Sequence, residues 1–249
     1  MSSPYCSVVI PVYNGEKYIA EAMRSALVQT FEDIEVVVVD DGSSDSSRSI
    51  IGEIARKDSR VVPLFMPKNG GVCEARNAGV AQARGEWVAF LDADDCWLPQ
   101  KLERQFTVLR ETSATLCCTG AWFVSSDGAK EKRIGVPTQI EAKSILRGNS
   151  IITSSVVAKA EVLRCFPMER PDLHEDLICW YNLLGQYGDA VGVNEPLLRY
   201  RLTPDSKSRD KVRAAWVTYK TYRYIGVKTV KAVWLFCGYA LHGIRRYYS

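Results

Sequence analysis

Two acidic clusters in the sequence each follow a run of apolar residues. Asp92 and Asp94 come directly after the run that ends at Leu91, with Ala93 between them. Carboxylates two positions apart in a turn can point at one spot, and such oxygen ligands suit Mg²⁺ or Mn²⁺ bound to substrate phosphates. A solvated acidic turn is the alternative, because many loops contain Asp-x-Asp. An EF-hand is excluded, since Trp97 stands where that loop requires glycine.

The second cluster, Asp40-Asp41-Gly42, follows the β-branched run 34–39. A carboxylate at the end of a strand can accept a hydrogen bond from N3–H of a uracil ring. The alternative, which this cluster alone favours, is an Asx-type turn in which Ser43 or Ser44 caps the next helix.

A glycine turn, Asn69-Gly70-Gly71, precedes a helical pattern that contains Arg76. The glycines allow close backbone approach, and Arg76 could reach a phosphate at the start of the helix. An ordinary surface arginine is the alternative. The sequence contains no Gly-x-Gly-x-x-Gly and no Walker motif, which argues against dinucleotide and P-loop sites.

A fourth acidic segment runs from Asp172 to Asp176. The spacing of Asp172 and Glu175 predicts a helix N-cap with its partner three residues on, which gives Glu175 a structural role. Asp176 then remains as a general base that could deprotonate an acceptor hydroxyl. Ordinary acids in a first helical turn are the alternative.

Strand-like and helix-like segments alternate, which predicts an α/β fold with a doubly wound, mostly parallel sheet flanked by helices. Such sheets bind ligands beyond the carboxyl ends of their strands, where both acidic clusters fall. Strands are predicted at 5–12, 34–39, 61–66, 87–91, 116–124 and 190–202, and helices at 15–29, 45–57, 72–83, 99–112 and 173–187, with a turn at 126–128 and a less regular middle.

The composition is that of a globular domain with a core, because 47% of the 249 residues are hydrophobic and 24% are charged. Eight cysteines without a Cys-x-x-Cys pair are predicted to be reduced, half-buried thiols in a reducing compartment. Two histidines are too few for a histidine-rich metal site. No signal peptide is recognised at the N-terminus, so a cytoplasmic protein is expected.

Taken together and in order, these segments resemble glycosyltransferase family 2. The resemblance covers about residues 5–200, is most specific in the first hundred, and rests on residues 7–14, 39–45, 69–71, 75–79, 90–95 and 175–176. It implies the GT-A fold and a UDP-sugar donor. The Gln-x-x-Arg-Trp motif of processive synthases is absent, which favours single additions.

The resemblance also implies a role for each matching residue. Pro11, Tyr13 and Asp41 would line the uridine pocket, and Arg76 would lie near the diphosphate. Asp92, Ala93 and Asp94 would form the Asp-x-Asp element, with Asp94 as the main metal ligand. Asp176 would be the base beside Glu175. The family often has Gly-Phe where this chain has Cys165-Phe166, and an arginine where Tyr181 follows Trp180. Both departures concern the acceptor side.

The expected activity is an inverting, Mn²⁺- or Mg²⁺-dependent transfer of one hexose or N-acetylhexosamine. The acceptor would be a lipid-linked saccharide of bacterial surface polysaccharide synthesis, at the inner face of the cytoplasmic membrane. One alternative is a sugar nucleotidyltransferase, which normally has a glycine-rich basic loop after its first strand. The other is an inactive binding module, which would be expected to lack one of the four acids of the metal and base sites. These acids, Asp92, Asp94, Glu175 and Asp176, are all present.

The charge divides the chain into an acidic body and a basic tail. Residues up to Leu198 carry 20 Lys and Arg against 27 Asp and Glu, whereas the remainder carries 12 against 2. We predict a domain at 1–204, with a nucleotide half to about 98 and an acceptor half from 99, and a helical aromatic and basic tail at 205–249. The longest uncharged run there, 232–244, is shorter than the roughly 20 apolar residues of a membrane span.

The tail therefore either lies on an anionic membrane surface or packs on the domain. Binding to nucleic acid is disfavoured, because the body of the protein is acidic.

Overall fold

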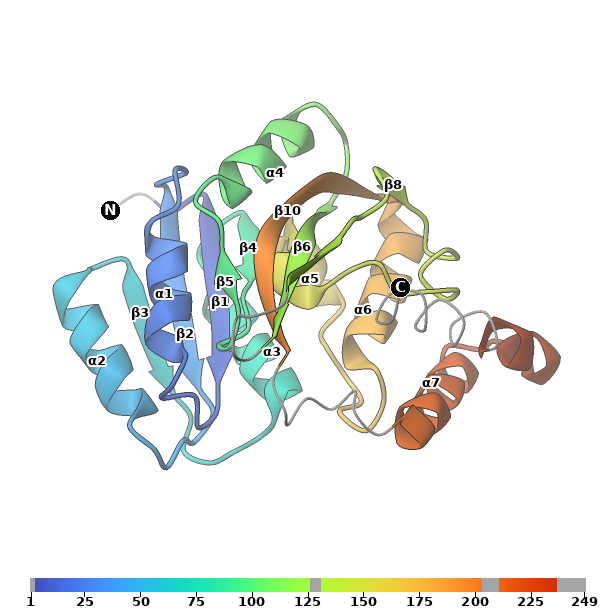
Figure 1. Ribbon diagram of the computed structural model, residues 1–249, viewed down its shortest axis with the longest axis horizontal. Coiled ribbons are helices and arrows are strands. Elements are labelled where there is room, and N and C mark those ends of the chain that lie inside the picture. Colours follow the sequence, from blue (N-terminus) through green and yellow to red (C-terminus); the bar gives the residue numbers. More distant parts are fainter. Residues whose placement is uncertain (1–2, 126–130, 203–210, 237–249) are drawn as a thin grey trace.

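Helices cover both faces of one twisted sheet in the computed structural model of the chain (Figure 1). The structure describes residues 3–125, 131–202 and 211–236. Side chains of strand β1 (Cys6–Val12) alternate between two cores: Val8 and Ile10 face one, and Val9 faces the other. This sheet, buried on both sides, explains why its central strands are continuous apolar runs.

The first half of the chain forms the parallel sheet that was predicted. The strands β1, β2 (Ile34–Asp40), β3 (Val61–Phe65) and β4 (Trp87–Phe90) lie in the order β3-β2-β1-β4 and are all parallel. Helices α1 (Ile19–Leu27), α2 (Ser47–Lys57) and α3 (Val72–Gln82) connect them. The carboxyl ends of the four strands therefore share one edge.

The second half extends the sheet with both strand directions. Its elements are β5 (Cys96–Trp97), α4 (Lys101–Arg110), β6 (Leu116–Ser125), β7 (Glu131–Ile134), β8 (Gln139–Ile140), β9 (Val157–Lys159), α5 (Ala160–Cys165), α6 (Glu175–Tyr187) and β10 (Ala190–Leu202). Strand β9 lies antiparallel between β4 and β6, and β10 lies parallel to β6. The long strands β6 and β10 thus point the same way as β1.

Four helices begin two to four residues later than predicted, including α4 at Lys101 and α6 at Glu175. Helix α1 begins at Ile19 instead of Gly15, and its N-cap is Tyr18. Asn14 lies in the preceding loop, where it has a φ of 49° and its side chain accepts a hydrogen bond from Ser44 N–H. Helix α2 begins at Ser47, and neither Ser43 nor Ser44 caps it. The predicted turn at 126–128 lies outside the described residues.

The described part of the tail packs on the domain. Helix α7 (Lys211–Tyr224) and the helical residues 229–236 bury Tyr222, Ala232 and Leu235 in the core on the α6 side of the sheet. The Tyr222 hydroxyl donates a hydrogen bond of 2.5 Å to the carbonyl of Leu146. No helix of the described residues is both long and apolar enough to cross a membrane.

No disulfide joins the seven cysteines of the described residues, as predicted. They are not half-buried, however: Cys165 is exposed and the other six are buried. Cys237 lies outside the described residues.

Candidate active site

The loops that follow β1 and β2 are joined by side-chain hydrogen bonds at the carboxyl edge of the sheet. The N–H of Asn14 donates to Ser43 Oγ at 2.9 Å, and Asn14 Oδ1 accepts from Ser44 N–H at 2.8 Å. Further bonds run from Gly15 N–H to Ser47 Oγ and from Glu16 N–H to Asp45 Oδ2. Pro11 and Tyr13, which the resemblance assigns to a uridine pocket, lie at the end of β1 and just after it. Pro11 is buried, and Tyr13 is 53% exposed.

Asp41 holds the glycine turn against the end of β2. Its carboxylate is buried and accepts hydrogen bonds from Gly70 N–H at 2.7 Å and from Gly71 N–H at 2.8 Å. Gly71 has a φ of 89°, which favours glycine at this point. A carboxylate has about four acceptor positions, so these two bonds leave capacity for a further donor.

Arg76 is a buried residue that joins three of the predicted segments, so the surface-arginine alternative is excluded. Its Nη2 lies 2.6 Å from Asp92 Oδ1, and its Nη1 lies 3.6 Å from Glu175 Oε1. Burial by itself disfavours the charged guanidinium, but the charges of Asp92, Glu175 and Asp176 outweigh burial and raise the pKa of Arg76. The structure thus brings α3, the Asp-x-Asp turn and the start of α6 together.

The Asp-x-Asp turn concentrates negative charge after β4. Burial, and next the charge of Asp92, raises the pKa of Asp94 to about 6. Burial and the charges of Asp94 and Asp92 also hold the pKa of Asp95 well above its usual range. Arg201, near the end of β10, donates from its backbone N–H to Asp95 Oδ1 and from Nε to the Asp94 carbonyl.

The donor set of this turn fits a hard divalent cation. Asp92 and Asp94 offer carboxylate oxygens. Burial and the charge of Asp92 raise the pKa of Asp94, and a cation would relieve the repulsion between the two acids. Among the described residues, no three His, Cys, Asp or Glu side chains form a metal-binding group. Phosphate oxygens and water would therefore complete the coordination, as they usually do for Mg²⁺.

The capping role predicted for Asp172 and Glu175 is wrong. Helix α6 begins at Glu175 itself, and its N-cap residue, His174, makes no side-chain capping bond. Asp172 is instead bound by both Nε and Nη2 of Arg170, each at 2.8 Å, which draws its carboxylate away from the helix end. Glu175 is therefore explained by its ion pair with Arg76 and not by a cap.

Asp176 is half-buried in the first turn of α6. Its Oδ2 accepts a hydrogen bond from Thr153 Oγ1 at 3.3 Å, and its Oδ1 accepts one from Leu177 N–H at 2.7 Å. Its charge contributes to the raised pKa of Arg76, so it lies in the same electrostatic environment as Glu175 and Asp92.

Three further residues at this site have no signal in the sequence. Ser154 Oγ accepts a hydrogen bond from Asp92 N–H at 2.9 Å. Arg201 contacts the acidic turn from β10, and Met168 exchanges two backbone hydrogen bonds with the Asn77 side chain, at 2.8 and 2.9 Å. No local pattern marks them, because each acts through a partner distant in sequence.

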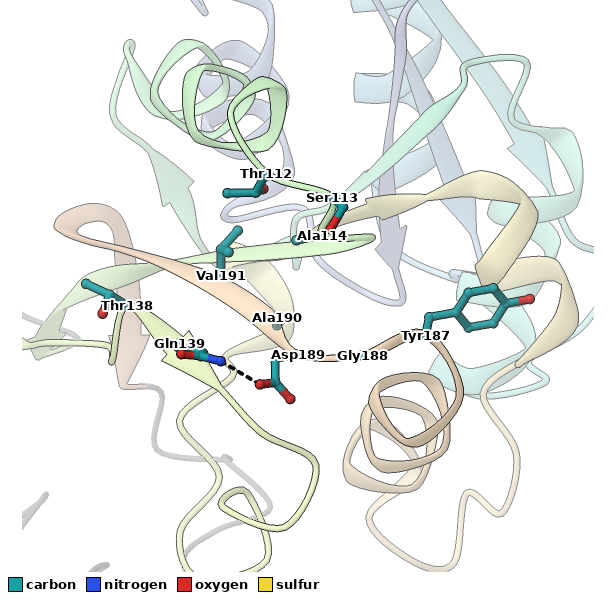
Figure 2. A pocket seen from close by; sticks show the side chains of 10 residues that line it. All are labelled: Thr112, Ser113, Ala114, Thr138, Gln139, Tyr187, Gly188, Asp189, Ala190 and Val191. Atoms are coloured by element: carbon teal, nitrogen blue, oxygen red, sulfur yellow. Dashed lines mark hydrogen bonds between the residues drawn. The ribbon is translucent and has the colours of Figure 1, made fainter.

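A separate cleft of about 440 Å³ lies at the other edge of the sheet, where α6 ends and β10 begins (Figure 2). Its polar side chains include Asp189 and Gln139, which share a hydrogen bond of 2.7 Å, while the Tyr187 ring points away from them. It contains none of the predicted site residues, so the candidate active site is the acidic edge described above.

Comparison with known proteins identifies the chain's relatives. The family described as "Glycosyl transferase family 2" matches residues 7–160. The putative teichuronic acid biosynthesis glycosyltransferase TuaG of Bacillus subtilis is 34% identical over 98% of this chain and 97% of its own length. The Escherichia coli protein named UDP-Glc:alpha-D-GlcNAc-diphosphoundecaprenol beta-1,3-glucosyltransferase WfaP is 28% identical over 96% and 93%.

Two solved structures share the fold. The mannosyltransferase PcManGT from Pyrobaculum calidifontis, in complex with GDP-Man and Mn²⁺, has a TM-score of 0.71 at 16% identity over 100% of this chain and 77% of its own. S. aureus TarS with UDP-GlcNAc has a TM-score of 0.70 at 19% identity over 96% and 72%. The fold is therefore GT-A, and the chain belongs to glycosyltransferase family 2.

Proposed function

We propose that this glycosyltransferase transfers a single sugar from a UDP-sugar to a hydroxyl of a lipid-linked saccharide, with inversion at the anomeric carbon. The observation that carries the proposal is the position of Arg76, which contacts both Asp92 and Glu175. This buried guanidinium connects the acids assigned to the donor with those assigned to the acceptor.

On the donor side, Pro11, Tyr13 and Asp41 bind the uridine, and Arg76 lies near the diphosphate. Asp92 and Asp94 would hold Mg²⁺ or Mn²⁺, and Ala93 between them would contact the nucleotide sugar. The bound cation would neutralise charge on the departing diphosphate. Two features support this assignment: the paired carboxylates, and the raised pKa of Asp94 beside Asp92.

On the acceptor side, Asp176 takes the proton of the attacking hydroxyl. The hydroxyl oxygen bonds to the anomeric carbon as the bond from that carbon to the diphosphate oxygen breaks on the opposite face. Glu175 is engaged in an ion pair with the Arg76 guanidinium, with Nη1 and Oε1 3.6 Å apart. This contact, and not a capping role, is the reason to prefer Asp176.

The relatives support this choice of donor and acceptor. WfaP and a second E. coli protein, WfgD, are both named as UDP-Glc:alpha-D-GlcNAc-diphosphoundecaprenol beta-1,3-glucosyltransferases. WfgD is 30% identical over 83% of this chain. We infer a UDP-hexose donor and an acceptor saccharide carried on a polyprenyl diphosphate, in surface polysaccharide synthesis.

The test is transfer from UDP-, GDP- and dTDP-sugars to a synthetic saccharide on a polyprenyl diphosphate, with Mn²⁺ or with excess chelator. We expect metal-dependent transfer from a UDP-sugar and one added residue, whose anomeric configuration NMR shows to be opposite to that of the donor. Retained configuration contradicts the single displacement. Formation of a nucleotide sugar from a sugar phosphate would favour the nucleotidyltransferase.

The outer face of the tail is the surface that we propose contacts the inner face of the cytoplasmic membrane. Trp216, Val230 and Trp234 are 58%, 85% and 63% exposed, and cationic side chains lie over both tryptophan rings: Lys220 over Trp216 and Arg147 over Trp234. Exposed aromatics among cations suit an anionic lipid surface.

Helix α7, which carries Trp216, contacts the acceptor side of the site through its buried face. The N–H of His174, the residue before Glu175, donates to Thr221 Oγ1 of α7 at 3.2 Å. A protein bound to lipid through α7 would therefore hold the start of α6 near the membrane, where a lipid-linked saccharide is found.

The membrane surface is tested by replacing Trp216 and Trp234 together with serine, with Tyr187→Ser as the matched exposed aromatic at the other edge. The double variant should lose binding to phosphatidylglycerol vesicles in a flotation assay, whereas Tyr187→Ser should bind as the wild type does. Equal vesicle binding by all three proteins would reject this surface.

A further inference from the structure

Three consecutive hydroxyl residues form a buried turn between the two sides of the site. Thr153, Ser154 and Ser155 make a single 3-10 turn before β9, and all three side chains are buried. The turn contacts two carboxylate residues that are far apart in sequence, Asp92 and Asp176.

Ser154 contacts the donor side. Its Oγ accepts the hydrogen bond from Asp92 N–H at 2.9 Å, at the first residue of the acidic turn. Its own carbonyl accepts a hydrogen bond of 2.7 Å from Nε1–H of Trp97, which is buried in β5. Ser154 is thus held by a large core side chain and in turn holds the backbone of Asp92.

Thr153 contacts the acceptor side. Its Oγ1 donates to Asp176 Oδ2 at 3.3 Å, while Leu177 N–H holds the other oxygen. At this length the bond is weak, and the role we assign to it is to restrict the rotamer of the Asp176 side chain. β-Branched Thr153 has few rotamers of its own, which suits this task.

We propose that Thr153 and Ser154 are positioning residues that set the separation between the metal-binding turn and the general base. Adjacent Cα atoms are about 3.8 Å apart across a trans peptide, so the two contacts cannot move independently. The inference rests on the proposed roles of Asp92 and Asp176. In this role the turn would align the donor sugar with the acceptor hydroxyl.

The Thr153 arm is tested with Thr153→Val, which removes the hydroxyl and keeps the branched shape. We expect kcat to fall by about tenfold or more, as misplaced reacting groups do, with an unchanged Kd for UDP in Mn²⁺. Thr153→Ser restores the hydroxyl and should recover most of the turnover. A loss of turnover that Thr153→Ser does not recover, or one matched by an equal loss of UDP affinity, overturns the Thr153 role.

For Ser154 we expect the opposite result, a loss of UDP affinity and not of kcat. Ser154→Ala leaves the Asp92 N–H without its acceptor, so UDP binding in the presence of Mn²⁺ should weaken by about tenfold, the cost of one buried hydrogen bond. Calorimetry with unchanged affinity overturns this role.

Ser155→Ala is the matched control within the same turn. The Ser155 hydroxyl donates to the Ile152 carbonyl at 2.7 Å and contacts neither carboxylate. Its removal should lower the thermal unfolding temperature about as much as the other two changes do, yet leave kcat and UDP affinity at wild-type values. If Ser155→Ala impairs turnover as strongly as Thr153→Val does, general destabilisation explains the effects and the proposal is wrong.

A double-mutant cycle separates this proposal from the proposed function. In an Asp176→Asn background, Thr153→Val should cause no further loss, because its effect passes through the Asp176 carboxylate. Additive losses contradict the positioning role while the base assignment stands. If Asp176→Asn alone retains wild-type turnover, the assignment of the base fails, and the Thr153 arm fails with it, whereas the Ser154 arm is still decided by UDP affinity.

Discussion

Buried Arg76 forms an ion pair with Asp92, whose side chain is 28% exposed, and their Nη2 and Oδ1 atoms are 2.6 Å apart. One of the two carboxylates of the Asp-x-Asp turn is therefore already partly neutralised within the protein. The charge of Asp94 is less well compensated, which agrees with a pKa raised to about 6 by burial and by Asp92. Of the two acids proposed to hold the metal, Asp94 is therefore the one whose charge a cation would compensate more.

Asp94→Asn should abolish transfer and leave the fold intact. The amide removes the charge that attracts the cation, while the half-buried position accepts a side chain of the same size. Calorimetry of UDP with and without Mn²⁺ should show that the metal no longer strengthens binding, and circular dichroism should match the wild type. Asp189→Asn, in the distant cleft, is the control, and full activity of Asp94→Asn would reject the metal site.

Asp176→Asn should lower turnover by about 10²–10⁴, the usual contribution of a general base, while UDP affinity persists. Glu175→Gln should have a smaller effect on turnover and should lower the unfolding temperature, because it removes one of the two ion-pair partners of buried Arg76. Single-turnover kinetics of both variants check this order. If Glu175→Gln stops turnover and Asp176→Asn does not, the two roles are exchanged.

Asp41→Ala should weaken UDP binding by about 1–3 kcal/mol, since a buried acceptor is lost. The structure adds a second cause: the Gly70 and Gly71 N–H groups lose their shared partner, and the turn before α3 is released. Asp41→Asn retains one acceptor oxygen and should fall between the wild type and Asp41→Ala. Calorimetry that gives all three proteins the same UDP affinity would exclude Asp41 from the nucleotide site.

Because of buried Lys101, the free energy of unfolding should increase with pH. Its ammonium is buried 3.9 Å from the centre of the Trp97 ring, and burial lowers its pKa to about 7, although nearby thiols act in the opposite direction. The unfolded chain, with a lysine pKa near 10.4, then binds more protons than the folded chain above pH 7. The free energy of unfolding therefore increases with pH from about 7, by at most about 1.4 kcal/mol per unit.

Urea titrations at pH 6.5, 7.5 and 8.5 measure this slope, and Lys101→Met should remove it. The window ends near pH 9, because burial raises the pKa of both Cys6 and Cys179 to about 12 and their thiols ionise first in the unfolded chain. One such thiol cancels the Lys101 slope, and the second reverses its sign. A wild-type slope that persists in Lys101→Met would show that another group is responsible.

The sequence predicts the parallel half of the fold well because each of its strands is a continuous apolar run followed by turn residues. It does not predict β9, since three residues between a 3-10 turn and a short helix carry no periodicity. The capping role fails for a similar reason: the spacing of Asp172 and Glu175 fits a capping box, but the bidentate contact with Arg170 depends on a side-chain pair that spacing alone does not reveal. Arg76 is recognisable by its motif, but its burial and its contact with Glu175, about a hundred residues later, are properties of the folded chain.

The position of β10 has a consequence for folding during synthesis. It lies between β6 and β5, and β5 finds its pairing partner, Leu198 and Arg199, only about 100 residues after Trp97. Ribosomes add about 5–20 residues per second, so β5 stays without its partner strand for roughly 5–20 s after it is synthesised. Strands β1 to β4 of the first half have all been synthesised by then. The Arg201 contacts to the acidic turn form at the same late stage. A nascent chain that stops before β10 therefore exposes an unpaired sheet edge, the kind of surface that chaperones bind, together with an incomplete active site.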